Sequence, residues 1–238
     1  MNYAEIADAI PTELSHAALD VALGDLHLLL ETPEERDNFT AILKVVSETT
    51  DFFSAPASAK FHLNTDGGLY RHSLGVTFRL LALDAAYNIF FEHSHFEALL
   101  CGLLHDIGKA GQVSLFEVDG TGTQVVVGNK FYHTSCEPYY IKQALKTKPG
   151  EYSFKRNPER VGMSIPVSSL HFIGTVLGDY WKPSPAAWAA VAYHDGMYVP
   201  EGQAVAHAET KLGLALHQAD MFQSRTEAEW SVGSGWHS

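Results

Sequence analysis

A histidine and an aspartate, His105 and Asp106, stand side by side near the end of an apolar, helix-like segment of this 238-residue chain. Neighbouring residues on a helix differ in direction by about 100°, so both side chains can turn toward one cation. The histidine would bind it through nitrogen and the aspartate through oxygen. Two ligands do not hold a metal ion securely. The pair therefore predicts a metal site only if other His and Asp residues complete the shell.

Further candidate ligands lie on both sides of this pair, in segments where the sequence predicts helices. His72 precedes the pair and Asp220 follows it, so the order along the chain is His, His-Asp, Asp. Two more histidines, His171 and His194, lie between the pair and Asp220. A single histidine on an apolar helix is more often a hydrogen-bonded core residue than a ligand. Order and position along the chain therefore do not settle ligation for these residues, and the family resemblance given below is what favours it.

Hydrophobic periodicity predicts the helices that must position the candidate ligands. Thr32, Pro33 and two acidic residues after them are typical of a helix start, and this helix is expected at about 33–48. Apolar stripes at helical spacing predict buried helices at about 70–90 and 95–108. Helical patterns resume further along the chain, at about 166–179, 184–194 and 206–225.

Three segments are expected to be non-helical. Residues 51–68, with a Gly-Gly pair at the end, predict a loop, and the polar segment 146–160 predicts an exposed loop. Strand-like runs at 113–118 and 124–127 flank a short Asp-Gly segment and predict a hairpin. We therefore expect one mostly α-helical domain with a small β-hairpin insertion near 113–128.

Composition limits the classes of function. The formal charge of −12, from 28 acidic and 16 basic residues, argues against broad, sequence-independent binding to a phosphate backbone. Cys101 and Cys136 form no C-x-x-C unit, so neither a disulfide framework nor a cysteine-based zinc site is expected. The start of the chain has no signal-peptide pattern, and no segment is apolar enough to span a bilayer. The expected location is the cytoplasm, without a membrane partner.

The residues around the candidate ligands resemble the HD-domain superfamily of metal-dependent phosphohydrolases. The likeness is carried by three short segments: Gly67-Gly68-Leu69-Tyr70-Arg71-His72, Leu103-Leu104-His105-Asp106-Ile107-Gly108-Lys109 and Ala219-Asp220. The sequences of these segments are similar to those of bacterial HD-domain 3'-5' exoribonucleases and of small HD proteins of phages. The resemblance implies an HD-like helical bundle over 51–227, with 1–50 as a helical extension packed on the core and 228–238 as a tail.

The resemblance also implies a ligand set for two metal ions. The first ion would be held by His72, His105, Asp106 and Asp220, and the second by Asp106, His171 and His194. A shell of nitrogen and oxygen ligands suits Mn, Fe, Co, Ni or Zn, with Mg kept as an alternative. Two such ions activate a water molecule and neutralise charge on a phosphoryl group. The expected reaction is hydrolysis of a phosphoester, with Asp106 bridging the ions.

Four further residues have candidate roles at this site. Lys109 is expected to reach a substrate phosphate, although interaction with a helix C-terminus explains it equally well. Asp195 is a candidate outer-shell partner or acid, and it could instead cap the turn that follows it. Arg225 is a candidate for substrate binding, and the alternative is that it forms a salt bridge. His62 is also a candidate for substrate binding, and the alternative is an ordinary surface position. His217 is assigned an ordinary packing role.

The leading hypothesis is a phosphohydrolase that acts on a nucleotide or short oligonucleotide, because the acidic balance favours small substrates. The alternatives are a 3'-5' exonuclease or a cyclic-nucleotide phosphodiesterase. Nucleic acid would bind only as short single strands, through a local basic contact formed by Lys148, Lys155, Arg156 and Arg160. A third alternative is a catalytically silent metal-binding interaction domain. The sequence leaves the substrate, the native metal and the oligomeric state open.

Overall fold

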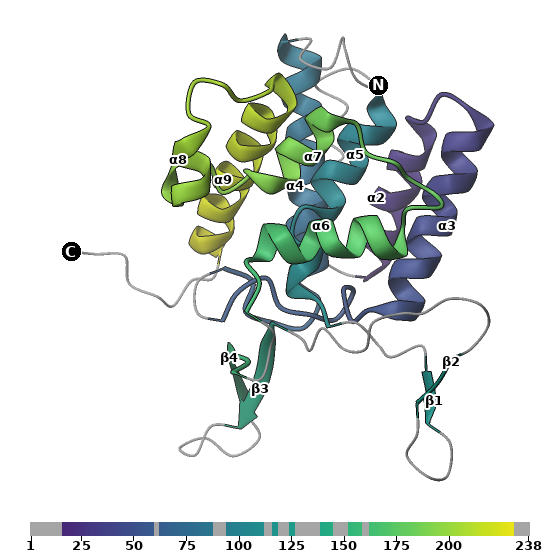
Figure 1. Cartoon of the computed structure of the whole chain (residues 1–238), viewed down its shortest axis with the longest axis vertical. Helices are drawn as coiled ribbons and strands as arrows, with labels where there is room; N and C mark the ends of the chain where they lie inside the picture. Colours follow the sequence, from purple (N-terminus) through teal and green to yellow (C-terminus); the bar gives the residue numbers. More distant parts are fainter. Residues whose placement is uncertain are drawn as a thin grey trace.

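The computed structural model describes residues 16–59, 62–87, 94–111, 116–118, 124–126, 139–144, 152–158 and 162–230. This part of the chain is mostly helical, as the sequence predicted (Figure 1). Its α-helices are α2 (His16–Leu28), α3 (Pro33–Thr49), α4 (Gly68–Tyr87), α5 (His95–Leu104), α6 (Ile165–Val176), α7 (Pro185–Ala192), α8 (Pro200–Ala204) and α9 (Lys211–Trp230). Two short 3₁₀ helices, η1 (Ile107–Lys109) and η2 (Gly196–Tyr198), follow α5 and α7.

Local chemistry explains where α3 begins. Thr32 accepts a hydrogen bond from the Glu35 backbone N–H at 3.1 Å, and the Glu35 carboxylate accepts one from the Thr32 N–H at 3.1 Å. This reciprocal pair satisfies two donors that the first turn of a helix leaves free. Pro33 costs nothing at the first helical position, because its missing N–H would have no partner there. The predicted boundary near residue 33 is therefore confirmed.

Two antiparallel hairpins project from the helical body, on the same side of it in Figure 1. The first, β1 (Phe116–Val118) with β2 (Gln124–Val126), pairs Glu117 with Val125 and confirms the hairpin predicted near 113–128. The second pairs β3 (Tyr140–Ala144) with β4 (Tyr152–Arg156). It corrects the exposed loop expected at 146–160, because residues 152–156 form a strand.

The second hairpin was missed because its polar composition conceals a short alternating pattern. Phe154 is buried, whereas the next residue, Lys155, is exposed, as expected when successive side chains point to opposite faces of a strand. At its base, the Tyr139 N–H donates to the Lys109 carbonyl oxygen at 3.0 Å, and the Asn157 N–H donates to the Tyr139 carbonyl oxygen at 2.9 Å. The first of these hydrogen bonds attaches the hairpin to η1, and the second closes the hairpin at its base.

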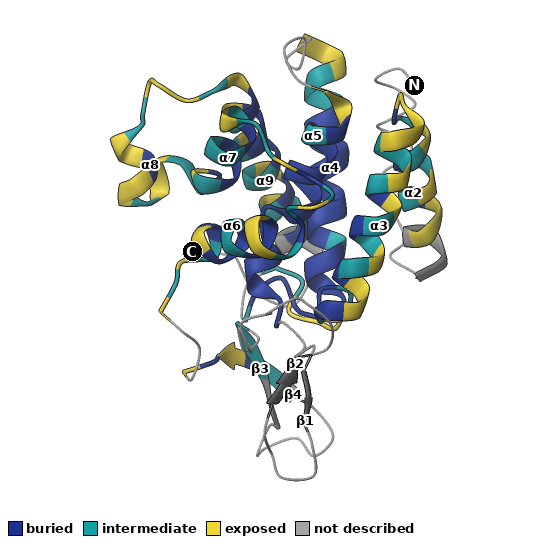
Figure 2. Cartoon of the chain, turned by 45° about the vertical axis from the view of Figure 1, so that its right-hand side comes forward, coloured by how far each residue is buried: buried dark blue, intermediate teal, exposed yellow. Residues whose placement is uncertain are grey.

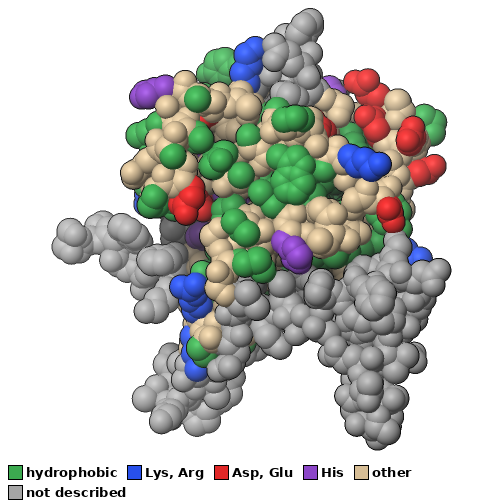
Figure 3. All heavy atoms as spheres, in the orientation of Figure 1, with side chains coloured by type: hydrophobic (Ala, Val, Ile, Leu, Met, Phe, Trp, Pro, Cys, Tyr) green, Lys and Arg blue, Asp and Glu red, His purple; other side chains and the backbone are tan. Residues whose placement is uncertain are grey.

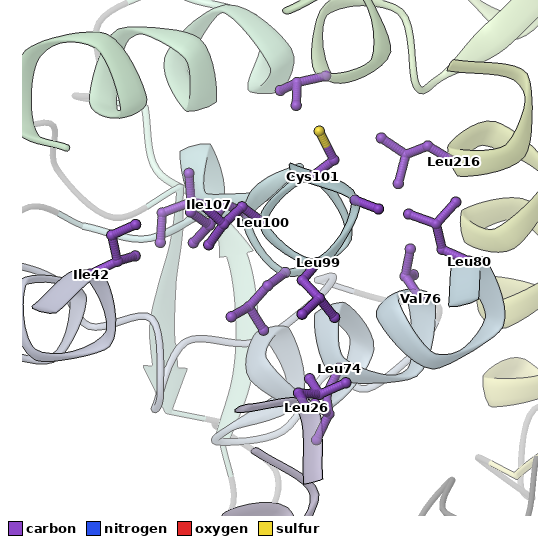
Figure 4. Packing of buried hydrophobic residues seen from close by; sticks show 14 of the residues in the cluster. Leu26, Ile42, Leu74, Val76, Leu80, Leu99, Leu100, Cys101, Ile107 and Leu216 are labelled. Carbon is purple, nitrogen blue, oxygen red and sulfur yellow. The ribbon is translucent and has the colours of Figure 1, made fainter. Parts of the chain in front are cut away.

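Helices α4 and α5 occupy the centre of the molecule. Figure 2 shows that both are largely buried, whereas α2, α3 and α8 expose one side. Around α5, Figure 4 shows side chains contributed by α2, α3, α4 and α9: Leu26, Ile42, Leu74 and Leu216. All of them belong to one continuous hydrophobic cluster, so the N-terminal helices share a core with the rest. The end of α5, where His105 and Asp106 follow, is therefore held from several directions.

Glycine allows α5 to approach α4 closely. A Cβ atom on Gly102 would lie 2.8 Å from the Thr77 Cα atom and 2.8 Å from its Oγ1 atom. Real side chains do not reach so close to a backbone atom, so an alanine would push the two helices apart. The separation of α4 and α5 matters for the site, because His72 is on one helix and His105 follows the other.

None of the helices in the described ranges combines the length and the apolar character needed to cross a membrane.

The substitution Gly102→Ala is expected to destabilise the protein by about 1–3 kcal/mol, because it overpacks the contact between α4 and α5. Urea unfolding followed by circular dichroism measures the change. Gly24→Ala is the matched control, because nothing lies within 4 Å of a Cβ built at this position of α2. That variant should gain about 0.5–1 kcal/mol from the better helix propensity of alanine. Equal stability of both variants would contradict the proposed close approach.

Candidate metal centre

The His105-Asp106 pair lies where α5 ends. The sequence predicted a helix to residue 108, but α5 stops at Leu104, and His105 is its C-cap with helical angles (φ −54°, ψ −38°). Asp106 leaves the helix at φ −105° and ψ 8°, and its carbonyl oxygen accepts the Lys109 N–H at 2.8 Å. This tight turn starts η1. The predicted helical arrangement of the pair is therefore corrected, because the 3₁₀ turn, rather than a continuing α-helix, directs the Asp106 carboxylate.

Three buried histidines hold their rings in the same way, through Nδ1. The Nδ1 atom of His105 lies 2.8 Å from the Gly102 carbonyl oxygen, and that of His194 lies 2.8 Å from the Val191 carbonyl oxygen. A carbonyl oxygen only accepts, so each Nδ1 must carry the proton. The third ring, His72, places Nδ1 2.9 Å from Oε2 of Glu227. In their neutral forms, all three imidazoles therefore present an Nε2 lone pair, which is the form that binds metal ions.

Two carboxylates face these Nε2 atoms. The Asp220 Oδ1 atom lies 3.0 Å from Nε2 of His72 and 3.9 Å from Nε2 of His105. The Asp106 carboxylate lies between the histidines, with Oδ2 3.6 Å from Nε2 of His72 and 3.4 Å from Nε2 of His105. Its other oxygen, Oδ1, lies 3.5 Å from Nε2 of His194. The two oxygens of Asp106 therefore face different histidines.

The donor atoms fit a divalent metal ion. Nε2 of His72 and of His105 are buried and make no hydrogen bond among the described residues, although both lie close to carboxylate oxygens. A divalent cation could be bound by these nitrogen atoms and by the facing carboxylate oxygens together. The donors of His72, His105 and Asp106 lie within 4.8 Å of one another, as do those of His105, His194 and Asp220. Buried His and Asp groups thus lie within metal-binding distance.

Lys109 compensates the charge of Asp106. Its Nζ atom contacts the Asp106 Oδ2 atom, and both side chains are buried. Burial alone would raise the pKa of Asp106, but the Lys109 ammonium, together with His105 and His194, holds it well below its usual value. Burial likewise opposes the charged form of Lys109, and the Asp106 carboxylate outweighs it, so the pKa of Lys109 is raised. Both groups are therefore charged at neutral pH.

Glu227 is a site residue that the sequence analysis missed. Besides its contact with His72, its Oε1 atom accepts a hydrogen bond from Gln223 Nε2 at 2.7 Å. Gln223 Oε1 in turn accepts from Arg79 Nε at 2.5 Å. Burial alone would raise the pKa of Glu227, but the His72 charge and hydrogen bond lower it. The available signal was its spacing, because Glu227 follows Asp220 by two helical turns and lies on the same side of α9.

Without a bound ion, the carboxylates keep two of the histidines protonated. Burial lowers the pKa of His72, but the charge of Glu227 and the close contacts of Asp220 and Glu227 raise it to about 10. Burial also lowers the pKa of His194, whereas Asp106 outweighs that effect and raises it to about 9. When no ion is present, the protons on these two rings offset the charge of the surrounding carboxylates.

The structure places the other predicted site residues at different distances from this cluster. His62 lies beside His72, with ring centroids 5.0 Å apart, and its buried Nε2 atom makes no hydrogen bond to the described residues. Burial, with the charges of His72 and Lys109, lowers the pKa of His62 to about 4. Asp195 is at the edge, where its half-exposed carboxylate has Oδ1 3.9 Å from Nε2 of His194.

Two predicted site residues do not join the cluster. His171 is on α6, half-buried, and belongs to none of the donor groups found among the described residues. Arg225 is exposed on α9, five residues after Asp220 and therefore about 140° away around the helix. The described part of the chain thus brings the four residues of the first predicted ligand set close together, in two overlapping donor groups. For the second set it brings together Asp106 and His194.

Comparison of the chain with protein-family models, with curated protein sequences and with solved structures finds no match. The likeness to HD-domain phosphohydrolases therefore stays a prediction that rests on the residues themselves.

Glu227→Gln is expected to weaken binding of Mn²⁺ or Zn²⁺ by about 10- to 100-fold, because a neutral amide orients His72 but no longer increases the basicity of its ring. Competition with a metal-binding dye measures the affinity, and circular dichroism checks the fold. Glu201→Gln, at an exposed position of α8, is the matched control and should leave the affinity unchanged. Equal affinity of the two variants would show that Glu227 has no part in metal binding.

The stability of the metal-free protein should decrease as the pH rises from about 7 to 10. The folded-state pKa values of His72 and His194, about 10 and about 9, exceed the ordinary value of about 6.5. Their contribution is therefore complete below pH 6.5 and is lost as the pH passes through 9 and 10. Asp106, Asp220 and Glu227 have lowered pKa values, so their contribution is lost in acid, below about pH 4.

Thermal unfolding of the metal-free protein between about pH 3 and pH 10 measures both effects. His207→Asn, at an exposed position, serves as the control and should keep the profile of the parent protein. Saturating Zn²⁺ should abolish the loss at high pH, because protons compete with the ion for the same nitrogen atoms. A flat metal-free profile between pH 7 and 10 would contradict the protonation of the buried histidines.

Proposed function

We propose that the chain is a metal-dependent phosphohydrolase whose ion is held by His72, His105, Asp106 and Asp220. The observation that supports this proposal is the common orientation of the buried imidazoles, with Nδ1 anchored and Nε2 facing two carboxylates. Here the second nitrogens of His72 and His105 face the same two carboxylates, Asp106 and Asp220, and that of His194 faces Asp106 as well. A nitrogen and oxygen donor set suits Mn²⁺, Fe²⁺, Co²⁺, Ni²⁺ or Zn²⁺.

A divalent ion bound by these residues would lower the pKa of a water molecule and withdraw negative charge from a phosphate oxygen. Asp106 orients the site, because its two oxygens face different histidines and its position is held by Lys109. The same carboxylate is suited to bridge a second ion on the side of His194. Lys109, paired with Asp106, reduces the negative charge that an approaching phosphate meets at the site.

The reaction that fits this arrangement is hydrolysis. The oxygen of water forms a bond to phosphorus and gives up one proton to solvent, the bond from phosphorus to the ester oxygen breaks, and the leaving oxygen takes up one proton. Asp195 is suited to pass that proton from solvent, because its carboxylate is 42% exposed and lies 3.9 Å from His194 Nε2. No Ser or Cys nucleophile takes part in this scheme.

The acidic balance of the chain favours a small substrate such as a nucleotide. A short single strand of nucleic acid is the second candidate substrate. The β3–β4 hairpin supports this candidate, because the Tyr139 N–H at the start of the hairpin is hydrogen-bonded to the Lys109 carbonyl oxygen. Lys155 and Arg156 are exposed on β4, and the Arg156 guanidinium lies 5.3 Å from the centre of the Tyr139 ring. Figure 3 shows Lys and Arg side chains where this hairpin leaves the helical body. Cleavage of a strand held in this way should weaken steeply with salt.

Asp106→Asn is expected to lower the rate of phosphoester hydrolysis by roughly 10²–10³-fold. A neutral amide binds a metal ion less tightly than a carboxylate and is poorly suited to bridge two ions. Asp37→Asn, at an exposed position of α3, is the matched control and should keep full activity. Circular dichroism checks that both variants are folded. Unchanged activity of Asp106→Asn would rule out the proposed mechanism.

The substrate class is found by removing metal with a chelator, reloading the protein with Mn²⁺, Fe²⁺, Co²⁺, Ni²⁺, Zn²⁺ or Mg²⁺, and offering a substrate panel. The panel holds mono-, di-, tri- and cyclic nucleotides together with short RNA and DNA strands. Release of inorganic phosphate identifies a phosphatase, and shortening of a labelled strand identifies a nuclease. Inactivity of every metal-loaded form on the whole panel would favour the catalytically silent interaction domain.

A further inference from the structure

A cavity of about 510 Å³ lies between the end of α7, the turn η2, the segment at 205–210 and α9, and its lining includes Tyr193, which precedes the candidate ligand His194. Figure 1 shows α7, α8 and α9 grouped on one side of the molecule. The walls are mainly apolar and include Tyr193, Met197, Tyr198, Leu214 and Met221. Met197 is 58%, Tyr198 70% and Leu214 52% exposed, which is high for large apolar side chains. A volume of this size is typical of sites for small organic ligands.

One histidine connects this cavity to the metal centre. His217 lines the cavity, and its Nδ1 atom donates a hydrogen bond to the His194 carbonyl oxygen at 2.8 Å. Asp220 follows His217 by three residues on α9, so the two side chains point about 60° apart around the helix. Tyr193, another lining residue, directly precedes His194 in the chain. The same two segments therefore build the cavity wall and supply two of the candidate ligands.

The wall around His217 is held in place by its neighbours. Gly196 adopts φ +59°, and a Cβ atom there would lie only 2.3 Å from the His217 ring, so this position needs glycine. The Tyr198 ring centroid lies 5.9 Å from that of His217, and the Tyr198 hydroxyl donates to the Met221 sulfur at 3.5 Å. The apolar surface is therefore largely formed before a ligand arrives, which lowers the entropy cost of binding.

The polar atoms of the cavity indicate the kind of ligand. Because Nδ1 of His217 donates to the backbone, its Nε2 atom is an acceptor in the neutral ring. Gln218, which also lines the cavity, offers both a donor and an acceptor through its amide. A flat ring that stacks on tyrosine and methionine, and carries donors and acceptors at its edge, matches such a surface. Nucleobases combine these properties.

We infer that this cavity binds the base of a nucleotide whose phosphate lies at the candidate metal centre. The inference rests on the proposed function, because it assigns the cavity to the same substrate. It narrows the substrate class from phosphoesters in general to nucleotides, and it makes Tyr198, Leu214, His217 and Gln218 determinants of specificity. The cavity recognises the base of the nucleotide, whereas the metal centre recognises its phosphate.

The test uses ligands that carry only one half of a nucleotide. Adenosine, guanosine, cytidine and uridine are offered to the full chain in metal-free form, alongside ribose 5-phosphate, and binding is measured by isothermal titration calorimetry. At least one nucleoside should bind without metal, and more tightly than ribose 5-phosphate. Leu214→Arg places a long charged side chain in the cavity, and it should weaken the binding of that nucleoside by about tenfold or more.

Matched variants separate loss of the subsite from loss of the fold. Leu28→Arg makes the same exchange on α2, at a leucine that is 74% exposed, and should leave nucleoside binding unchanged. Tyr198→Ala removes a stacking surface from a 70% exposed side chain, and it should also weaken the nucleoside. Leu28 and Tyr198 are on the surface, so the variants at these positions should fold, and circular dichroism verifies this.

Several results would overturn the inference. They are failure of all four nucleosides to bind at millimolar concentration, equal binding of ribose 5-phosphate, and a nucleoside affinity that neither Leu214→Arg nor Tyr198→Ala changes. Failure of the proposed function has a different signature, because nucleosides would then still bind while the metal-loaded protein hydrolyses nothing on the substrate panel. The two failures are therefore distinguishable.

Discussion

The buried carboxylate of Asp106 is the group on which the rest of the site depends. An isolated charge in the interior is unstable, and it persists only where opposite charge and hydrogen-bond donors surround it. Lys109 supplies the opposite charge from the next turn of the chain, and His105 and His194 approach the carboxylate through Nε2. His105 and Lys109 lie at the end of α5, whereas His194 follows α7. The carboxylate therefore requires the end of α5 and the turn after α7 to meet with little freedom.

The hydrophobic core provides that precision. Helix α5 is surrounded by α2, α3, α4 and α9, so the turn at its end cannot shift without disturbing many contacts (Figure 4). The carboxylates of α9 reach the site from the opposite side, where Asp220 and Glu227 contact the two nitrogens of His72. Gln223 and Arg79 extend this contact into a chain of polar groups between α4 and α9. The apolar packing sets the helix positions, and the polar chain sets the ring orientation.

Sequence patterns predicted well what local chemistry controls. The capping residues before α3, the apolar stripes of α4 and α5, and the strand-like runs of β1 and β2 are local signals, and each appears as predicted. The same reasoning missed β4, because its order depends on tertiary hydrogen bonds at the base of the hairpin and on burial of Phe154. The sequence also placed His105 and Asp106 within a helix. In the structure His105 is the C-cap of α5, and Asp106 starts the 3₁₀ turn that follows.

The sequence by itself determined the donor types, their order and the helices that carry them, because residue identity and apolar periodicity are local properties. Only the tertiary structure decided which donors meet. It brought His72, His105, Asp106, His194 and Asp220 together, left His171 outside the donor groups of the described residues, and added Glu227 as the partner of His72. Spacing along the chain does not encode helix separation or rotation. Those depend on close packing between residues far apart in sequence, such as Gly102 against Thr77.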